Sequence, residues 1–278
     1  MSEPKARLAA ALAERFGETF EAPDTAGLET LAGMADRRSM RAYTPRDVPG
    51  ELVRTLCAVA LSAPTKSDLQ QADIVVVSDA GVRAKLDEWC GENPWVKAAP
   101  VFLVFCANNR RQMRVQELRG RAFANDHLDA FFNAAVDAGI ALSAFVTAAE
   151  AAGLGTCPIS AIRNRAADVS ALLGLPDRVF PVAGLCVGWP AHPGAISPRL
   201  PTGLRVHENR YDEGDLDAAI AAYDERRNRT RLFARQRDPA RFGTAPSYGW
   251  SEDKARQYAT PERADFGAHV RKIGFRLD

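Results

Sequence analysis

Apolar positions along the chain recur with two periods, which predict two kinds of element. Three runs rich in β-branched or aromatic residues, at 73–77, 100–106 and 179–187, predict buried strands. Helical spacing is far more common. It covers residues 5–16, 28–35, 51–62, 81–90, 126–152, 163–173, 215–235 and 251–273. Because strands are few and no regular βαβ alternation is present, the pattern predicts an α+β sandwich and not a Rossmann fold.

The longest predicted helix, 126–152, has apolar or small side chains around most of its circumference. Such a helix must be covered on most sides. Either a central position in the fold or a subunit interface explains it. Gly153 follows as the expected C-terminal cap. The helically spaced apolar positions are Leu128, Phe131, Phe132, Ala135, Val136, Gly139, Leu142, Phe145, Val146 and Ala149, and the small residues of the other flank are Ala134, Ala138, Ala141, Ala144 and Ala148.

Composition places the chain among soluble globular proteins. Its 278 residues allow one domain or two, and 46% hydrophobic with 26% charged residues is ordinary for a protein with a sizeable core. The 36 basic and 35 acidic residues give a net charge of +1, so no global field favours nucleic acid. An attraction for an anion must therefore be local.

The cysteines and the N-terminus indicate a cytoplasmic protein. The five cysteines are scattered, mostly in apolar runs, without CxxC or zinc spacing, which is typical of buried thiols in a reducing compartment. No run of about 18 apolar residues predicts a membrane span. Residues 5–16 mix acids and bases, unlike a secretory signal.

Four polar or glycine-containing motifs follow one another along the chain. The first, Arg37-Arg38-Ser39-Met40-Arg41, reads alone either as a solvated basic turn or as an anion clamp, because guanidiniums bind phosphate oxygens bidentately. The others are the loop 63–70, the segment 153–159, and Gly188-Trp189-Pro190 followed by Pro198-Arg199-Leu200-Pro201.

These motifs, in this order, resemble the nitroreductase family of FMN-dependent oxidoreductases over residues 36–278. Segments 184–190, 198–201 and 206–211 are similar to its group-A branch of NADPH-dependent nitroreductases and flavin reductases, and Trp250-Ser251 and Gly274-Phe275 extend the similarity. The resemblance implies a mostly antiparallel central sheet flanked by helices. It also implies an intertwined homodimer with 126–152 at its core, and a helical extension, 1–35, before an FMN-binding domain, 36–278.

The resemblance assigns the phosphate end of FMN to Arg37, Arg38, Ser39 and Arg41, a motif that in relatives also reaches toward the flavin pyrimidine edge. Arg199 is the family's distal phosphate-binding arginine. The basic residue that relatives carry two positions earlier is Ser197 here. One phosphate contact is therefore either missing or supplied by Lys66.

The remaining flavin contacts are assigned in the same way. Thr65, Lys66 and Ser67 surround the ring and ribityl chain, and Asn93 bonds the pyrimidine. The strand end Pro158, Ile159, Ser160 and Ala161 packs on the isoalloxazine, where a backbone N–H bonds flavin N5 in relatives. Ser160 and Ala161 replace commoner residues and narrow the pocket. Cys157 is either a redox thiol or, with apolar neighbours and no second cysteine nearby, a packing residue.

The C-terminal arginines are assigned to the substrates. Arg263 falls on a substrate-contacting position of the branch, or is a surface charge. Residues 226–241 contain seven arginines. Of these, Arg235, Arg237 and Arg241 are candidates for the 2′-phosphate of NADPH. A solvated helix and an RNA-binding tail are the alternatives; neutral net charge and the lack of interleaved aromatics argue against RNA.

The sequence thus predicts an oxidoreductase whose chemistry is carried by FMN, without a side-chain nucleophile or a metal. NADPH or NADH donates a hydride, and a nitroaromatic, quinone or related small molecule then accepts two electrons in a ping-pong cycle. Neither nucleic acid nor membrane is an expected partner. The alternatives are a flavin reductase that releases reduced FMN to a partner, and an FMN-binding protein with little turnover.

Overall fold

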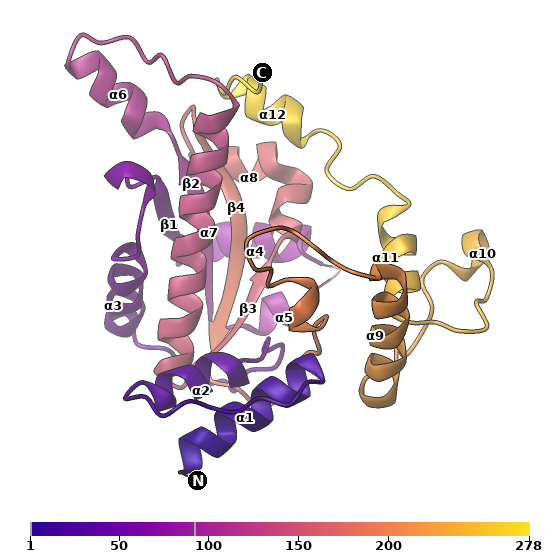
Figure 1. Cartoon of the computed structure of the whole chain (residues 1–278). Coiled ribbons are helices and arrows are strands. Elements are labelled where there is room, and N and C mark those ends of the chain that lie inside the picture. Colours follow the sequence, from indigo (N-terminus) through magenta and orange to yellow (C-terminus); the bar gives the residue numbers. More distant parts are fainter. Residues whose placement is uncertain (1, 92) are drawn as a thin grey trace. The chain divides into compact units, whose positions relative to one another are not determined.

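The computed structural model describes residues 2–91 and 93–278; Met1 of the predicted extension and Glu92 lie outside the described residues (Figure 1). The chain forms two compact units. One, here called the sheet unit, comprises residues 39–194 and 263–278, and the other, the helical unit, comprises residues 2–38 and 195–262. The predicted division into a 1–35 extension and a 36–278 domain stays a prediction.

The sheet unit is built on four antiparallel strands in the order β1-β2-β4-β3. The register pairs Ile74 with Phe105, Leu103 with Leu185, and Cys157 with Cys186. The three predicted strands are confirmed within a few residues. The strands are β1 (Ala72–Val76), β2 (Val101–Asn108), β3 (Gly155–Ile159) and β4 (Val179–Gly188).

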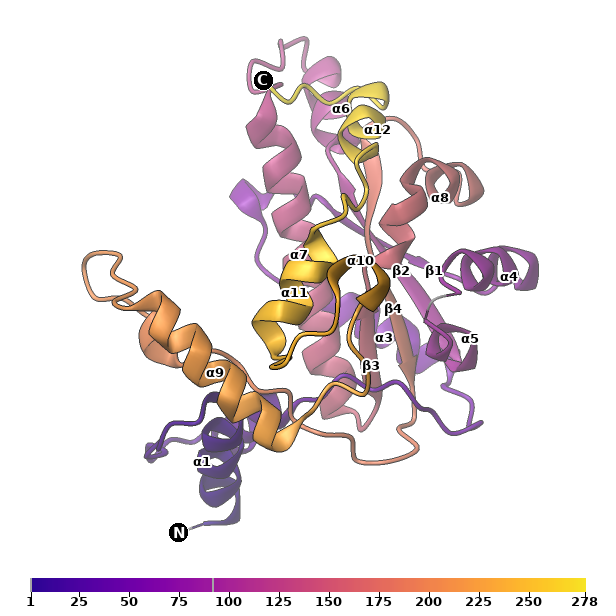
Figure 2. The ribbon, with the colours of Figure 1, turned by 90° about the vertical axis from the view of Figure 1, so that its right-hand side faces the viewer.

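Helices cover both faces of this sheet, which explains why β2 and β4 are continuously apolar. Leu103 and Phe105 of β2 point to the face covered by α3 and α7, while Phe102 and Val104 point to the opposite face. Figure 2 shows α7 on one side of the strands and α4, α5 and α8 on the other. The helices of the sheet unit are α3 (Gly50–Leu61), α4 (Ala80–Trp89), α5 (Trp95–Ala98), α6 (Arg110–Leu118), α7 (Leu128–Ala151), α8 (Ala166–Leu172) and α12 (Phe266–Lys272), with short 3-10 turns η1 (Lys66–Asp68) and η2 (Ala161–Arg165).

Helix α7 is covered on one side only. Ala134, Ala138 and Phe145 are fully buried against the sheet and α3, whereas Phe132 is 59% exposed. Leu128, Val136 and Ile140 continue this exposed stripe. Among the described residues α7 is the one helix long and apolar enough to cross a membrane, with a mean hydropathy of 1.5, but its packing on the sheet is that of a core helix. Gly153, one residue beyond the capping Ala152, adopts the expected left-handed conformation at φ 81°.

The helical unit has its own small cores. Leu8 of α1 and Ala32 of α2 are buried together with Ala22. Tyr223 of α9 meets Trp250 of α11 edge to face at 5.3 Å. Gly17 ends α1 in the left-handed conformation, and a Cβ there would lie 2.5 Å from Cδ of Arg226. The elements of this unit are α1 (Glu3–Phe16), α2 (Leu28–Asp36), η3 (Thr202–Leu204), α9 (Leu216–Thr230), α10 (Pro239–Phe242) and α11 (Trp250–Tyr258).

Two predictions about helices are corrected. The single helix expected at 251–273 is interrupted between Tyr258 and Phe266, where Pro261 removes a backbone donor and Arg263 adopts a positive φ of 57°. The helix expected at 215–235 ends at Thr230. The structure also contains α6, which the apolar periodicity did not reveal because its residues are mostly charged or polar and none of them is buried.

Candidate functional site

The arginine-rich motif crosses from the helical unit into the sheet unit after Arg38. In the sheet unit, Ser39 forms a parallel bridge to Thr156, and the N–H of Met40 donates to the Thr156 carbonyl at 2.8 Å. Met40 is buried over Gly155, where any Cβ would lie 2.5 Å from its Cγ. Ser39 and Met40 are therefore fixed along β3, the strand that carries Pro158 and Ile159 of the predicted isoalloxazine contacts.

Arg41 and Asn93 share one region of the sheet unit. The Arg41 guanidinium lies 5.2 Å from the ring centroid of Trp95. Asn93 forms the turn before α5, its N–H donating to the Cys90 carbonyl at 2.7 Å and its carbonyl accepting from the N–H of Val96 at 2.9 Å. The Arg41 guanidinium therefore lies against Trp95, the residue two positions after Asn93, which is predicted to bond the flavin pyrimidine.

The loop that carries Thr65, Lys66 and Ser67 has an unusual backbone. Ser67, Asp68 and Gln70 all have positive φ, between 50° and 55°. Each such non-glycine residue costs about 1–2 kcal/mol. Strain of this size persists only where surrounding contacts fix the chain, and it concentrates at functional sites.

Asp137 of α7 supplies one of these contacts. Its carboxylate accepts from the N–H of Lys66 at 2.9 Å and from the N–H of Gln71 at 3.2 Å, and the residue is only 2% exposed. Its two oxygens thus hold both ends of the strained turn. Sequence reasoning missed Asp137, although a carboxylate in the apolar middle of a helix is a visible signal of a buried acceptor.

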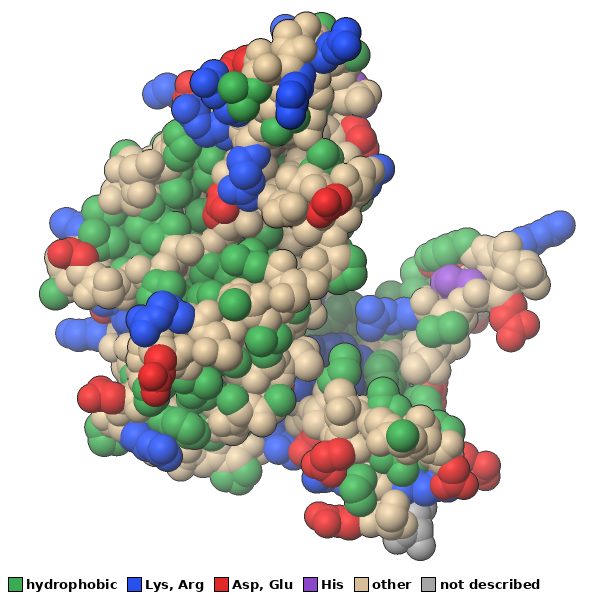
Figure 3. Space-filling view, turned by 90° about the vertical axis from the view of Figure 1, so that its left-hand side faces the viewer, with side chains coloured by type: hydrophobic (Ala, Val, Ile, Leu, Met, Phe, Trp, Pro, Cys, Tyr) green, Lys and Arg blue, Asp and Glu red, His purple; other side chains and the backbone are tan. Residues whose placement is uncertain are grey.

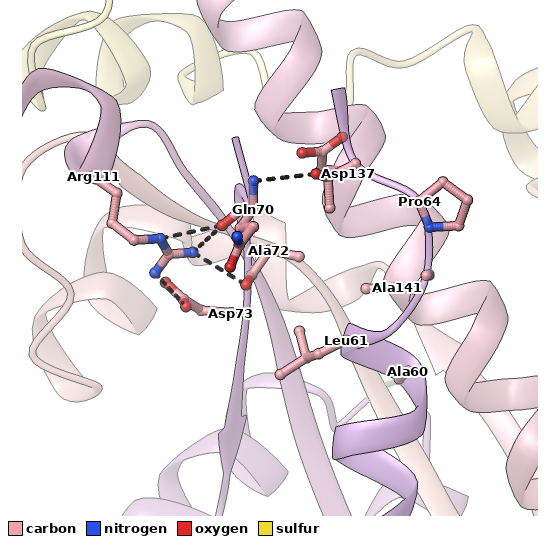
Figure 4. Close-up of a pocket in the computed structure, with 11 residues that line it drawn as sticks. Ala60, Leu61, Pro64, Gln70, Ala72, Asp73, Arg111, Asp137 and Ala141 are labelled. Atoms are coloured by element: carbon pink, nitrogen blue, oxygen red, sulfur yellow. Dashed lines mark hydrogen bonds and ion pairs between the residues drawn. The ribbon is translucent and has the colours of Figure 1, made fainter. Parts of the chain in front are cut away.

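Arg111 supports the same loop from α6. Its guanidinium pairs with Asp73 at 2.7 Å and donates to the carbonyls of Gln70 and Ala72 (Figure 4). A cavity of about 290 Å³ opens beside these contacts. It is lined by Ala60, Leu61, Thr65, Gln70, Asp137 and Ala141, among others.

The strand end 158–161 leads from β3 into η2. Ile159 is buried, whereas Pro158 and Ser160 are exposed and Ala161 is intermediate. Arg263 reaches this segment: its Nη2 donates to Ser160 Oγ at 3.3 Å, and its Nε donates to Asn164 Oδ1 at 2.9 Å. The structure therefore brings the predicted substrate arginine to the predicted flavin-packing strand end.

In the helical unit, Arg37, Arg38 and Arg199 lie at the ends of segments joined by Arg15. The Arg15 guanidinium donates to the Arg37 carbonyl at 2.7 Å and to the Ser197 carbonyl at 3.2 Å. Arg38 pairs with Asp36 at 2.6 Å, and its Nε is buried without a hydrogen-bond partner among the described residues. Sequence reasoning missed Arg15, because one arginine in an amphipathic helix carries no distinguishing signal.

The three arginines predicted to bind the NADPH 2′-phosphate have different environments. Arg237 pairs with the buried Asp253 at 3.0 Å, and Arg241 donates to Thr260 Oγ1 at 2.6 Å. Burial alone would raise the pKa of Asp253, but hydrogen bonds from Lys254 and Tyr248 and the charges of Lys254 and Arg237 lower it. Arg235 and Arg237 line a cavity of about 770 Å³ together with Arg256.

Two of the buried cysteines, Cys90 and Cys106, have thiols of raised pKa. No disulfide joins the five cysteines within the described residues, and burial raises the pKa of Cys90 to about 11 and that of Cys106 to about 12. Thiols with such pKa values stay protonated and unreactive. Within residues 2–91 and 93–278, no three His, Cys, Asp or Glu side chains are grouped to hold a metal ion.

Comparisons with known proteins find relatives that match most of the chain. Residues 34–189 match the model "Nitroreductase family", and residues 197–278 match "Nitroreductase family, C-terminal domain". An FMN reductase [NAD(P)H] of Bacillus subtilis is 38% identical over 200 residues, covering 71% of this chain and 80% of that protein. An oxygen-insensitive NADPH nitroreductase of Salmonella typhimurium is 36% identical over 196 residues, covering 70% and 80%. The solved structure of B. megaterium NfrA2 superposes with a TM-score of 0.80 at 35% identity, covering 90% of this chain and 98% of that one.

Proposed function

Because the chain belongs to the nitroreductase family, we propose that it uses FMN to carry two electrons from NADPH or NADH to a small electron-poor acceptor. The chain is an FMN-dependent NAD(P)H oxidoreductase of the branch that includes FMN reductases and NADPH nitroreductases. FMN supplies the redox chemistry by accepting a hydride and passing electrons on. The protein's own residues bind, orient and shield it.

The helical unit fits the phosphate end of FMN. Arg37, Arg38 and Arg199 supply guanidiniums on segments that Arg15 joins, and the buried Nε of Arg38 lacks an acceptor among the described residues. A phosphate oxygen is the acceptor that such a donor set favours. This is the single observation that carries the proposed cofactor site. Ser39, next in sequence, adds a hydroxyl.

The sheet unit supplies the proposed contacts to the rest of the cofactor. The strained loop presents Thr65, Lys66 and Ser67, which take the ring and ribityl chain. Arg41 and Asn93 take the pyrimidine edge, where a cation stabilises the anionic reduced flavin. The strand end, Pro158, Ile159, Ser160 and Ala161, packs on the isoalloxazine and offers a backbone N–H to N5.

The proposed substrate contacts are the C-terminal arginines. Arg263 lies at Ser160 and takes the nicotinamide donor or the acceptor. Arg235, Arg237 and Arg241 take the 2′-phosphate of NADPH. Because Asp253 already balances the charge of Arg237, Arg235 carries most of the preference for NADPH over NADH.

A homodimer is proposed from the exposed apolar face of the sheet unit. Figure 3 shows hydrophobic side chains gathered over the side on which α3 and α7 lie. Phe132, Val136 and Ile140 of α7 and Val59 and Leu61 of α3 are between 36% and 59% exposed. A second copy of the chain covers them in this proposal. The resulting enzyme is soluble and cytoplasmic, without a nucleic-acid or membrane partner.

The alternative is a flavin reductase, favoured by the name of the Bacillus subtilis relative, FMN reductase [NAD(P)H]. The two activities differ in whether FMN stays bound between turnovers. Steady-state rates with a benzoquinone or a nitroaromatic acceptor at several NADPH concentrations decide the point. Parallel double-reciprocal lines with FMN retained through gel filtration support the oxidoreductase. Loss of FMN on the column, with turnover that depends on added FMN, supports the flavin reductase.

A further inference from the structure

Several arginines of the helical unit converge on the short segment that begins at Ser197. Arg231, just after α9, donates from Nη1 to Ser197 Oγ at 2.8 Å. Arg15 of α1 donates from Nη1 to the Ser197 carbonyl at 3.2 Å, and Arg199 also lies against that carbonyl, at 3.4 Å. Three guanidiniums from distant parts of the sequence therefore contact one serine.

Arg15 connects this segment to the arginine-rich motif. It is only 8% exposed, and its Nε and Nη2 donate to the Ala35 carbonyl at 3.1 Å and 2.8 Å. The same Nη2 donates to the Arg37 carbonyl at 2.7 Å. In return, the Arg15 carbonyl accepts from the N–H of Arg199 at 2.7 Å. One residue of α1 thereby fixes the spacing between Arg37 and Arg199.

A second residue at the end of α1 secures the arrangement. The Glu18 carboxylate accepts from the N–H of Thr202 at 2.9 Å and from its hydroxyl at 2.6 Å. On the other side, the Tyr223 hydroxyl donates to the Pro198 carbonyl at 3.1 Å. Residues 198–202 are therefore held from α1 and from α9, and Ser197 itself is held by Arg15 and Arg231.

The cluster concentrates positive charge. Burial, followed by the charges of Arg199 and Arg37, lowers the pKa of Arg15, and the opposing effects of Asp36 and Glu14 are smaller. Asp36 is paired with Arg38, and Glu18 is engaged by Thr202. Cations held together in this way are stabilised by a bound anion, and a phosphate monoester matches guanidinium geometry.

We propose that helix α1 is part of the FMN phosphate site: Arg15 positions Arg37 and Arg199, and Arg231, held on Ser197, supplies an additional cation to the phosphate. The family model begins only at residue 34, so α1 lies outside the part of the chain that it matches. The inference rests on the proposed cofactor site and assigns a role to the N-terminal extension.

Binding of FMN and of riboflavin, which lacks the phosphate, tests this directly. The full-length protein is stripped of flavin, and each dissociation constant is measured by quenching of flavin fluorescence. Arg231→Met is expected to raise the Kd for FMN about tenfold, equivalent to about 1.4 kcal/mol, and to leave the Kd for riboflavin within twofold. Arg15→Met is expected to act in the same direction. Adding Ser197→Lys to Arg231→Met is expected to restore FMN binding, because it returns a cation to the segment.

Matched controls separate this role from general charge effects. Arg229→Met removes an exposed arginine paired with Glu225, two residues before Arg231, and is expected to leave both constants unchanged. Arg7→Met removes an arginine of α1 that pairs with Glu29, and it is likewise expected to leave both dissociation constants unchanged. Circular dichroism confirms folding, and Arg231→Met decides the question if Arg15→Met does not fold.

The outcomes are distinguishable. If the wild-type protein binds riboflavin as tightly as FMN, the proposed phosphate site itself is wrong. If it prefers FMN but Arg231→Met and Arg15→Met keep the full preference, only the role of α1 and Arg231 is wrong. If the variants change the KM for NADPH but not for NADH, with FMN binding intact, the cluster serves the 2′-phosphate of NADPH and the inference is overturned.

Discussion

Asp137 shows how one side chain fixes a strained backbone. Its two carboxylate oxygens accept the N–H groups of Lys66 and Gln71, on either side of three residues with positive φ. The loop is exposed, so little other packing holds this conformation. The contact couples a buried residue of α7 to the loop expected to surround the flavin.

Replacing this carboxylate should therefore weaken both the fold and cofactor binding. Asp137→Asn leaves one backbone N–H facing an amide donor, and we expect it to lower the free energy of unfolding by about 1.5–3 kcal/mol. Urea denaturation measures this loss, and flavin fluorescence should show a weaker complex with FMN. Asp68→Asn is the control: this exposed carboxylate of the same loop accepts a hydrogen bond from the Gln70 side chain, and the change should stay within about 0.5 kcal/mol. Equal effects of the two substitutions would contradict the role of Asp137.

The sequence indicates candidate site residues by their type, but not the contacts that position them. Arg37, Arg38, Ser39 and Arg41 are recognisable because their spacing is local. The partners of Asp137 and Arg15 are not recognisable, because each side chain contacts backbone atoms that are distant in the sequence. Such contacts depend on how helices pack, and no sequence pattern encodes them. Ser197 is the clearest example, since its partner Arg231 follows 34 positions later.

At the level of elements, the apolar pattern predicted β1, β2 and β4 and most helices, but not the short strand β3. Burial of a strand on two faces requires a continuous apolar run, and β3 contains Gly155, Thr156 and the exposed Pro158. The prediction of elements failed where other features of the fold override the apolar pattern. The helix expected at 251–273 breaks at Pro261, and the exposed polar helix α6 has no apolar stripe to detect. The prediction of helix α7 is confirmed, and the structure adds that only one of its sides is covered by the described residues of its own chain.

The contact between α12 and α8 contains a titratable group. The His269 ring lies 3.2 Å from Ser170 Oγ, and burial, with a smaller contribution from Lys272, lowers the pKa of His269 despite the opposing charge of Asp265. The unfolded chain therefore binds a proton at His269 more readily than the folded chain does. The stability that depends on this group is fully present above the ordinary histidine pKa of 6.5 and decreases as the pH falls below that value. The decrease ends once the pH has passed the lowered pKa of His269 in the folded protein.

This predicts a pH dependence that one substitution should reduce. The unperturbed pKa of histidine lies between about pH 7.5 and about pH 5.5. When the pH is lowered across this range, the wild-type protein should lose more stability than the His269→Gln variant. Thermal denaturation at both pH values gives the comparison. His192→Gln, an exposed histidine in a loop, should leave the pH dependence as in the wild type. A His269→Gln protein with the full wild-type pH dependence would show that another group is responsible.

For the whole molecule, the exposed stripe of α7 predicts the quaternary structure. Phe132→Glu places a charge at the centre of the proposed interface, where its burial is unfavourable. Sedimentation velocity should find the wild-type protein at twice the chain mass and Phe132→Glu largely at the chain mass. Ala84→Glu on α4, on the opposite side of the sheet, should remain dimeric (Figure 2). A monomeric wild-type protein that retains FMN would exclude the intertwined dimer.

The central claim is that the folded protein binds FMN and that NADPH or NADH reduces it. Anaerobic stopped-flow absorbance of the purified protein tests this most directly, in separate mixings with NADPH and NADH. We predict rapid loss of the visible flavin band, faster with NADPH, and its return when a quinone is added. A yellow protein that neither nucleotide bleaches would instead be an FMN-binding protein with little turnover. A colourless protein that cannot be reconstituted with FMN would contradict the account altogether.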